Sequence, residues 1–109
     1  MDTRLSDGTE TLLSAATTTG AGTALDIVGR STQTFQAVGQ TASGSGSATI
    51  KIQVSNNGTN WLDLGTITLT LGTSAASDGF AAYAPWAYVR ANITAISGTG
   101  ASVTVTIGV

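Results

Sequence analysis

The stretch that decides the fold is residues 48–55, which read ATIKIQVS. Apolar side chains alternate there strictly with Thr, Lys, Gln and Ser. Because successive side chains of a strand point to opposite faces, this period of two predicts a half-buried β-strand. Residues 55–60, SNNGTN, follow as a turn, since Asn-Gly readily supplies the positive φ angles that hairpins need.

The same alternation continues on both sides of this hairpin. Upstream, residues 34–40 form a strand with Phe35 and Ala37 on one face, and a short strand fits within residues 21–29. Downstream, residues 61–64, 67–71, 88–96 and 103–109 are strands, and the apolar phase switches at Gly65-Thr66, which predicts a bulge. No segment has helical spacing of apolar residues, so the pattern predicts an all-β fold, an antiparallel β-sandwich or a barrel. The predicted core consists of Ile50, Ile52, Val54, Val89, Ala91, Ile93, Val103, Val105 and Ile107.

Gly- and Ser-rich segments between the strands predict loops at residues 41–47 and 73–79. Residues 1–22 predict an irregular N-terminal arm, and residues 23–109 the β-sandwich domain. Ordering about twenty residues costs ~1–2 kcal/mol each, more than Leu5, Leu12 and Leu13 return by burial. We therefore expect the arm to be mobile in the free protein and to place Leu12 and Leu13 against a neighbouring subunit.

The composition excludes several functional classes. The chain of 109 residues has no Cys and no His, which removes disulfides, thiolate chemistry and the usual general base and metal ligand. Its six acidic residues are scattered, so we expect no enzyme, no catalytic residues and no cofactor. Four scattered cations and a net charge of −2 argue against nucleic acid. No apolar run could span a membrane, and no secretion signal begins the chain, so we expect a soluble protein made in a cytoplasm.

The chain is also poor in charge, with 9% charged residues against 41% hydrophobic ones. Either binding partners cover much of the surface, or Ser and Thr hydroxyls keep the surface hydrated. The segment at residues 7–10, DGTE, lacks the alternating acidic ligands of a calcium loop, and we expect no metal site.

Two kinds of side chain are candidates for contact with a partner. Arg90 lies in a predicted strand, where it either binds a partner's carboxylate or pairs with Asp78 or Asp63; the pairing within the chain is favoured. Among the aromatic residues, size favours a core position for Trp61 and Phe80. Trp86 follows the only proline and suits either the core or a loop contact.

Four segments carry a resemblance to a known family: residues 54–61 (VSNNGTNW), 77–80 (SDGF), 84–93 (APWAYVRANI) and 97–101 (SGTGA). In this order and spacing the chain resembles small virion structural proteins of tailed bacteriophages, over roughly residues 10–109. The Ser-Asn-x-Gly-x-x-Trp and Tyr-Val-Arg parts are also similar to discoidin-like sugar-binding sandwiches. Those domains are longer and carry ligand-bearing loops that this chain lacks.

The phage resemblance implies a jelly-roll-like sandwich located in the virion. It implies a capsid decoration or cement protein whose partner is the major capsid protein or another virion protein, and a homo-oligomer, with a trimer favoured. The expected partner contacts are Leu12, Leu13, Trp86 and Arg90. The alternative function is a carbohydrate- or receptor-binding module of a tail or head fibre.

Overall fold

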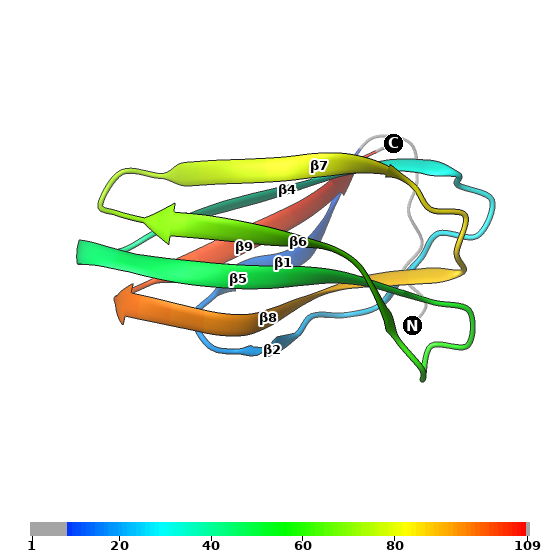
Figure 1. The fold of residues 1–109 in the computed structure, drawn as a ribbon, viewed down its shortest axis with the longest axis horizontal. Coiled ribbons are helices and arrows are strands. Elements are labelled where there is room, and N and C mark those ends of the chain that lie inside the picture. Colours follow the sequence, from blue (N-terminus) through cyan, green and yellow to red (C-terminus); the bar gives the residue numbers. More distant parts are fainter. Residues whose placement is uncertain (1–8, 109) are drawn as a thin grey trace.

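The computed structural model describes residues 9–108, and within that range it is all-β (Figure 1). Its strands are β1 (Thr9–Ala16), β2 (Gly20–Ala21), β3 (Leu25–Asp26), β4 (Thr32–Gln40), β5 (Ser43–Ser55), β6 (Leu62–Leu71), β7 (Ala76–Tyr83), β8 (Tyr88–Thr99) and β9 (Ser102–Gly108). They form two antiparallel sheets that pack face to face, so the predicted β-sandwich is confirmed.

The strand order is that of a jelly roll. One sheet has the order β1-β9-β4-β7, and the other has the order β2-β8-β5-β6, with β3 also pairing to β8. The chain crosses between the sheets at nearly every connection, which is how a jelly roll winds its strands. The sequence-based expectation of a jelly-roll-like architecture therefore agrees with the observed topology.

The winding has a simple geometry, because the whole described chain is one long hairpin that has been rolled up. Its tip is the connection between β5 and β6. On either side of that tip, β4 pairs with β7, β2 and β3 pair with β8, and β1 pairs with β9. Paired residues lie about equally far from the tip: Val54 faces Leu62, Thr32 faces Tyr83, and Thr9 faces Gly108.

The core lies between the two sheets and matches the sequence pattern. All nine residues predicted to point inward are buried, with no more than 2% of any of them exposed. Phe35 from β4 joins this core, and its ring lies 5.2 Å from that of Phe80 on β7. The prediction of a core position is thus confirmed for Phe80, which packs against the core while remaining partly exposed.

Two bulges set which side chains face inward. In β6 the extra residue is Leu64, next to the predicted Gly65-Thr66. Gly65 is required there, since a Cβ at this position would lie 2.6 Å from the Phe80 ring. In β8 the extra residue is Thr94, so Ala95 is exposed rather than sharing the inward face of Ile93.

Two predicted loops are wrong in part, for one physical reason. Residues 43–47 begin β5 and pair with β8 and β6, and residues 76–79 begin β7 and pair with β4. Gly, Ser and Ala leave no apolar alternation to read, although the backbone still pairs. Gly46 and Gly79 lie so close to backbone carbonyls of the neighbouring strand that a side chain would collide with them.

The predicted irregular arm is also wrong where the structure describes it. Thr9–Ala16 is strand β1, which pairs with β9, and Gly20–Ala21 pairs with β8. Two register shifts interrupt β1 and break the alternation that would have predicted a strand. Residues 1–8 lie outside the described residues, and whether residues 1–22 act as a separable arm stays a prediction.

Candidate functional site

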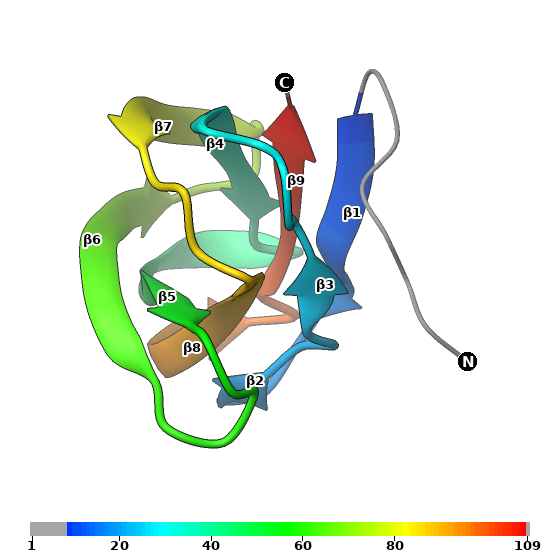
Figure 2. The same cartoon turned by 90° about the vertical axis from the view of Figure 1, so that its right-hand side faces the viewer.

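Three loops meet at one end of the sandwich, the end that faces the viewer in Figure 2. They connect β3 to β4, β5 to β6, and β7 to β8, and backbone hydrogen bonds tie them together. Ile27 N donates to Ala87 O at 2.9 Å, and Ala84 N donates to Ser31 O at 2.8 Å. Asn56 Oδ1 accepts from Ala87 N at 3.3 Å. We call this group of loops the loop end.

The tip of the rolled hairpin belongs to the loop end and is built by its own side chains. The hydroxyl of Ser55, buried at 1% exposure, accepts from the backbone N–H of Asn57 and of Gly58. Asn57 Oδ1 accepts from the N–H groups of Thr59 and Asn60, both at 2.9 Å. Gly58 has a φ of 74°, as the Asn-Gly signal predicts. The turn is therefore stabilised by hydrogen bonds to its own side chains.

Exposed apolar groups are concentrated at the loop end. Tyr83 is 75% exposed at the end of β7, Leu62 is 57% exposed at the start of β6, and Val28 is 49% exposed in the β3–β4 loop. The loops at the opposite end contain only small or hydroxyl side chains, in residues 17–19, 41–42, 72–75 and 100–101. The two ends of the sandwich are thus chemically different.

A buried amide lies in β4 just after the β3–β4 loop. Gln33 has no exposed surface, and its Nε2 donates to Arg30 O at 3.1 Å. Its Oε1 accepts no hydrogen bond from residues 9–108. A buried acceptor that finds no donor costs about 1–3 kcal/mol, so Gln33 is the buried polar side chain to examine next to the loop end.

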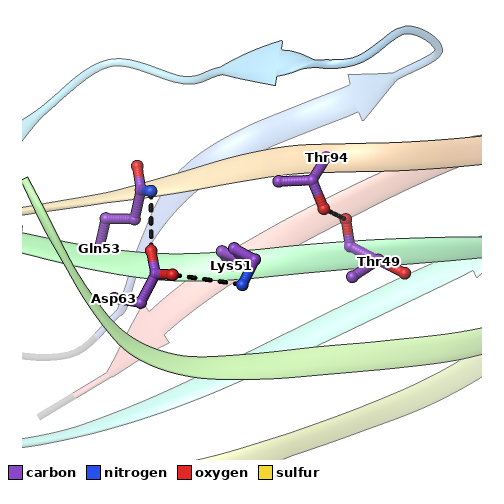
Figure 3. Close-up of polar contacts among 5 residues, drawn as sticks. All are labelled: Thr49, Lys51, Gln53, Asp63 and Thr94. Atoms are coloured by element: carbon purple, nitrogen blue, oxygen red, sulfur yellow. Dashed lines mark hydrogen bonds and ion pairs between the residues drawn. The ribbon is translucent and has the colours of Figure 1, made fainter.

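A connected row of side chains crosses the outer face of the β2-β8-β5-β6 sheet, and Figure 3 shows three of its members, Lys51, Gln53 and Asp63. Arg90 on β8 lies over the Trp61 ring, with its Cζ 4.3 Å from the ring centroid, and its Nε donates to Gln53 Oε1 at 2.9 Å. Gln53 Nε2 donates to Asp63 Oδ1 at 2.9 Å, and Lys51 Nζ binds Asp63 Oδ2 at 3.2 Å. We call Trp61, Arg90, Gln53, Asp63 and Lys51 the polar row.

The partners of Arg90 differ from those expected. Sequence reasoning favours Asp63 or Asp78, but in the structure the amide of Gln53 stands between Arg90 and Asp63. The register places Gln53 directly opposite both residues, Arg90 on one side and Asp63 on the other. Trp61 is half-buried beneath the guanidinium rather than in the core, so its predicted core position is wrong.

The polar row lowers the pKa of Asp63. The hydrogen bond from Gln53 is the largest cause, and the hydrogen bond and charge of Lys51 act in the same direction. Both favour the carboxylate over the protonated acid. Because the folded pKa lies below the ordinary value of 3.8, this group stabilises the fold above that pH, and the contribution disappears as the pH falls through the folded pKa.

We expect Asp63→Asn to abolish this pH dependence. The difference in melting temperature between the two proteins should be constant at neutral pH and should shrink below the ordinary pKa of 3.8. The difference should be small, since exposed ion pairs contribute little. Thermal melts of both proteins across the acid range measure it. A difference that does not change with pH would contradict the stabilising role of the Asp63 charge.

The other predicted contact residues lie on or near the core. Leu12 on β1 is buried at 5% exposure and belongs to the core, and Leu13 is half-buried against it. Trp86, in the β7–β8 loop, also packs against the core with part of its surface exposed. Leu12, Leu13 and Trp86 therefore contribute to the core of the sandwich, whereas Arg90 lies on the outer face of a sheet.

The outer face of the β1-β9-β4-β7 sheet carries no charged side chain in the described part of the chain. Residues paired across antiparallel strands share a face of the sheet. The register partners of the exposed β4 residues therefore lie on the same outer face. We call it the uncharged face; its members are Thr9, Thr11, Thr32, Thr34, Gln36, Val38, Gln40, Ser77, Gly79, Ala81, Tyr83, Ser102, Thr104 and Thr106. Composition alone could not have found it, because it depends on the pairing of four strands.

The acidic residues of this sheet are on its other side. Glu10 on β1 pairs with buried Ile107, and Asp78 on β7 pairs with buried Ala37, so the register places both on the inner side of the two edge strands. Glu10 is half-buried there, whereas Asp78 remains exposed. Charges in such positions oppose edge-to-edge pairing with other strands. The edges of the sheet are therefore protected while its outer face stays neutral.

The described residues were compared with the side-chain clusters that bind metal ions and with membrane-spanning helices. Among residues 9–108, no three His, Cys, Asp or Glu side chains are grouped so that they could hold a metal ion. Asp7 and Gly8 of the DGTE segment lie outside that range. The described residues also form no helix of the length and apolarity that a membrane-spanning helix has.

Comparisons with known proteins show the fold. No family model and no curated protein matches the chain. Among solved structures, the chain is similar to the crystal structure of PBSX exported protein XepA, with a TM-score of 0.60 and 15% sequence identity. The match covers 91% of this chain and 35% of that protein, so this chain spans about a third of its neighbour's length.

Proposed function

We propose that this protein is a structural component of a phage particle, and that it decorates or cements the head by binding other virion proteins. The observation that carries the proposal is the uncharged face. Charged residues are depleted at the centre of protein–protein interfaces. Covering hydroxyl and amide groups that find new hydrogen-bond partners costs far less than covering charges.

The structural comparison supports the phage setting. The neighbour PBSX exported protein XepA is phage-related, and it shares this sandwich despite low sequence identity. Jelly rolls are also a frequent architecture of viral capsid domains. A virion location and the major capsid protein as partner follow from this proposal, as does a small homo-oligomer such as a trimer.

The mechanism is stabilisation by mass action rather than catalysis. A protein that binds only the assembled shell lowers the free energy of that shell and raises the temperature or osmotic stress at which it breaks. The uncharged face is formed by four paired strands, whose backbone is held by the hydrogen bonds of the sheet. Little conformational entropy is then lost when the face is covered.

The test places one charge on the uncharged face. Gln36 is exposed at the centre of β4, and Gln36→Glu changes its charge while keeping its shape. We expect this variant to bind heads stripped of the protein at least about tenfold more weakly, because an unpaired charge is then buried. Binding curves on stripped heads measure the affinity, and light scattering measures the oligomer.

The matched control is Ser74→Glu, which adds a charge at an exposed position in the β6–β7 loop, outside both the uncharged face and the polar row. This variant should bind as the wild type does. Equal affinity of Gln36→Glu and wild type would remove the uncharged face from the mechanism. Wild-type protein without affinity for heads, together with unchanged stability of particles lacking it, would overturn the cement function.

A second function, a carbohydrate- or receptor-binding module of a fibre, is favoured by the loop end. Tyr83 is 75% exposed there, and loops at the end of a sandwich are common binding sites. This function is supported if the protein binds host cells or glycans saturably and has no affinity for stripped heads.

A further inference from the structure

Two contacts hold the guanidinium of Arg90 in place. Its Cζ lies 4.3 Å from the centroid of the Trp61 ring, and its Nε donates to Gln53 Oε1 at 2.9 Å. The amide of Gln53 is itself fixed, because its Nε2 donates to Asp63 on the other side. Turning this amide over would break both hydrogen bonds, so the arrangement defines the orientation of every group in it.

Most N–H donors of Arg90 have no acceptor within the described part of the chain. An arginine has five N–H groups, and Nε–H is the only one that donates to a residue in the range 9–108. The nearest acid in the polar row, Asp63, already binds Gln53 and Lys51. Arg90 is thus a half-buried cation for whose two Nη groups no acceptor is found among residues 9–108.

We propose that Arg90 is a pre-formed receptor for a carboxylate on a protein partner, which it binds through both Nη groups. The planar guanidinium matches a carboxylate with two parallel hydrogen bonds. Because Nε is occupied by Gln53, the carboxylate approaches the two Nη groups from the end of the side chain. The site rests on the proposed function, since it supplies one specific contact between virion proteins.

The surroundings favour an acidic side chain of a protein over an acidic sugar. Arg90 already covers one face of the Trp61 ring, so a sugar ring cannot stack on that face. The neighbours of Arg90 lie on a sheet whose outer face includes Lys51, Gln53 and Asn92. A sheet face suits another protein surface, whereas small ligands usually bind in concave sites.

The contacts that fix Arg90 before binding also reduce the entropic cost of binding a carboxylate. A free arginine loses side-chain entropy when it binds, and this loss removes much of the gain from a surface ion pair. Arg90 is already fixed by Trp61 and Gln53 in the unbound protein, so less entropy remains to be lost. Lys51 differs from Arg90 in that its ammonium already binds a carboxylate, that of Asp63 at 3.2 Å.

The experiment titrates the full-length protein with an acetylated, amidated hexaglutamate peptide at constant ionic strength, with sodium chloride as the reference salt. NMR signals of the Arg90 Nε–H and the Trp61 indole N–H report on the site. We expect saturable shifts with the peptide and none with chloride. Arg90→Lys keeps the charge but loses the planar pair of donors, and it should weaken binding at least about fivefold.

The matched control is Lys51→Ala, which removes one positive charge from the same face and should change the affinity less than twofold. Equal losses from Arg90→Lys and Lys51→Ala, or no saturable shift in the wild type, would overturn the receptor. Tighter binding of a glucuronate oligosaccharide than of the peptide would overturn its assignment to a protein partner. None of these outcomes depends on capsid binding, which the stripped-head assay tests separately.

Discussion

Truncation of Ile52 to Ala is expected to lower the free energy of unfolding by ~2–5 kcal/mol. Ile52 lies in the second half of β5, has no exposed surface, and pairs with Ala91 on one side and Gly65 on the other. Both partners are small, so neighbouring side chains cannot easily fill the cavity that truncation leaves. Chemical denaturation of both proteins, with comparison of midpoints and slopes, measures the loss.

Ile52→Val is the graded control for this prediction. It removes one methyl group from the same place and should lower the free energy of unfolding by ~0.5–1.5 kcal/mol. A loss well below 1 kcal/mol from Ile52→Ala would mean that β5 does not pack in the observed register.

Leu12→Ala should have a comparable effect, ~2–5 kcal/mol, although Leu12 lies in the segment whose composition predicts a mobile arm. The structure buries Leu12 at 5% exposure in the core and leaves its neighbour Leu13 only half-buried. Leu13→Ala removes the same atoms one residue away and should therefore cost much less. Denaturation of the two variants beside the wild type makes the comparison.

This pair of variants distinguishes two roles for β1. If β1 leaves the sheet in the free protein, as the arm hypothesis requires, neither truncation will change the free energy of unfolding. Both would then reduce binding to stripped heads, where a neighbouring subunit would cover the two leucines. A large loss from Leu12→Ala alone assigns β1 to the sandwich.

The sequence predicted the parts of the fold in which side-chain alternation is strong. The strands around Ile52, Val89 and Val105 were read correctly because one face of each is buried by the other sheet. β1 and the first residues of β5 were missed. In β1 two register shifts break the alternation, and in β5 the run of Ser and Gly has no apolar face to read.

The candidate site was less predictable, for a related reason. Arg90 was singled out from its charge in a strand, but its contact with Gln53 depends on the register of three strands. Size alone predicted that Trp61 is buried, and could not show that a guanidinium rather than the core covers it. The uncharged face likewise arises only when distant strands are paired.

The rolled hairpin has a consequence for the order of folding. Contacts such as Thr9 with Gly108 join residues far apart in sequence, and chains dominated by such contacts fold slowly. If pairing starts at the ordered turn around Asn57, however, each strand pair brings the next pair close together and shortens the loop still to be closed. We expect β5 and β6 to associate early and β1 and β9 last. The pair β1 and β9 should then also be the first to separate in the native state. β1 is therefore the strand most easily displaced from the sandwich.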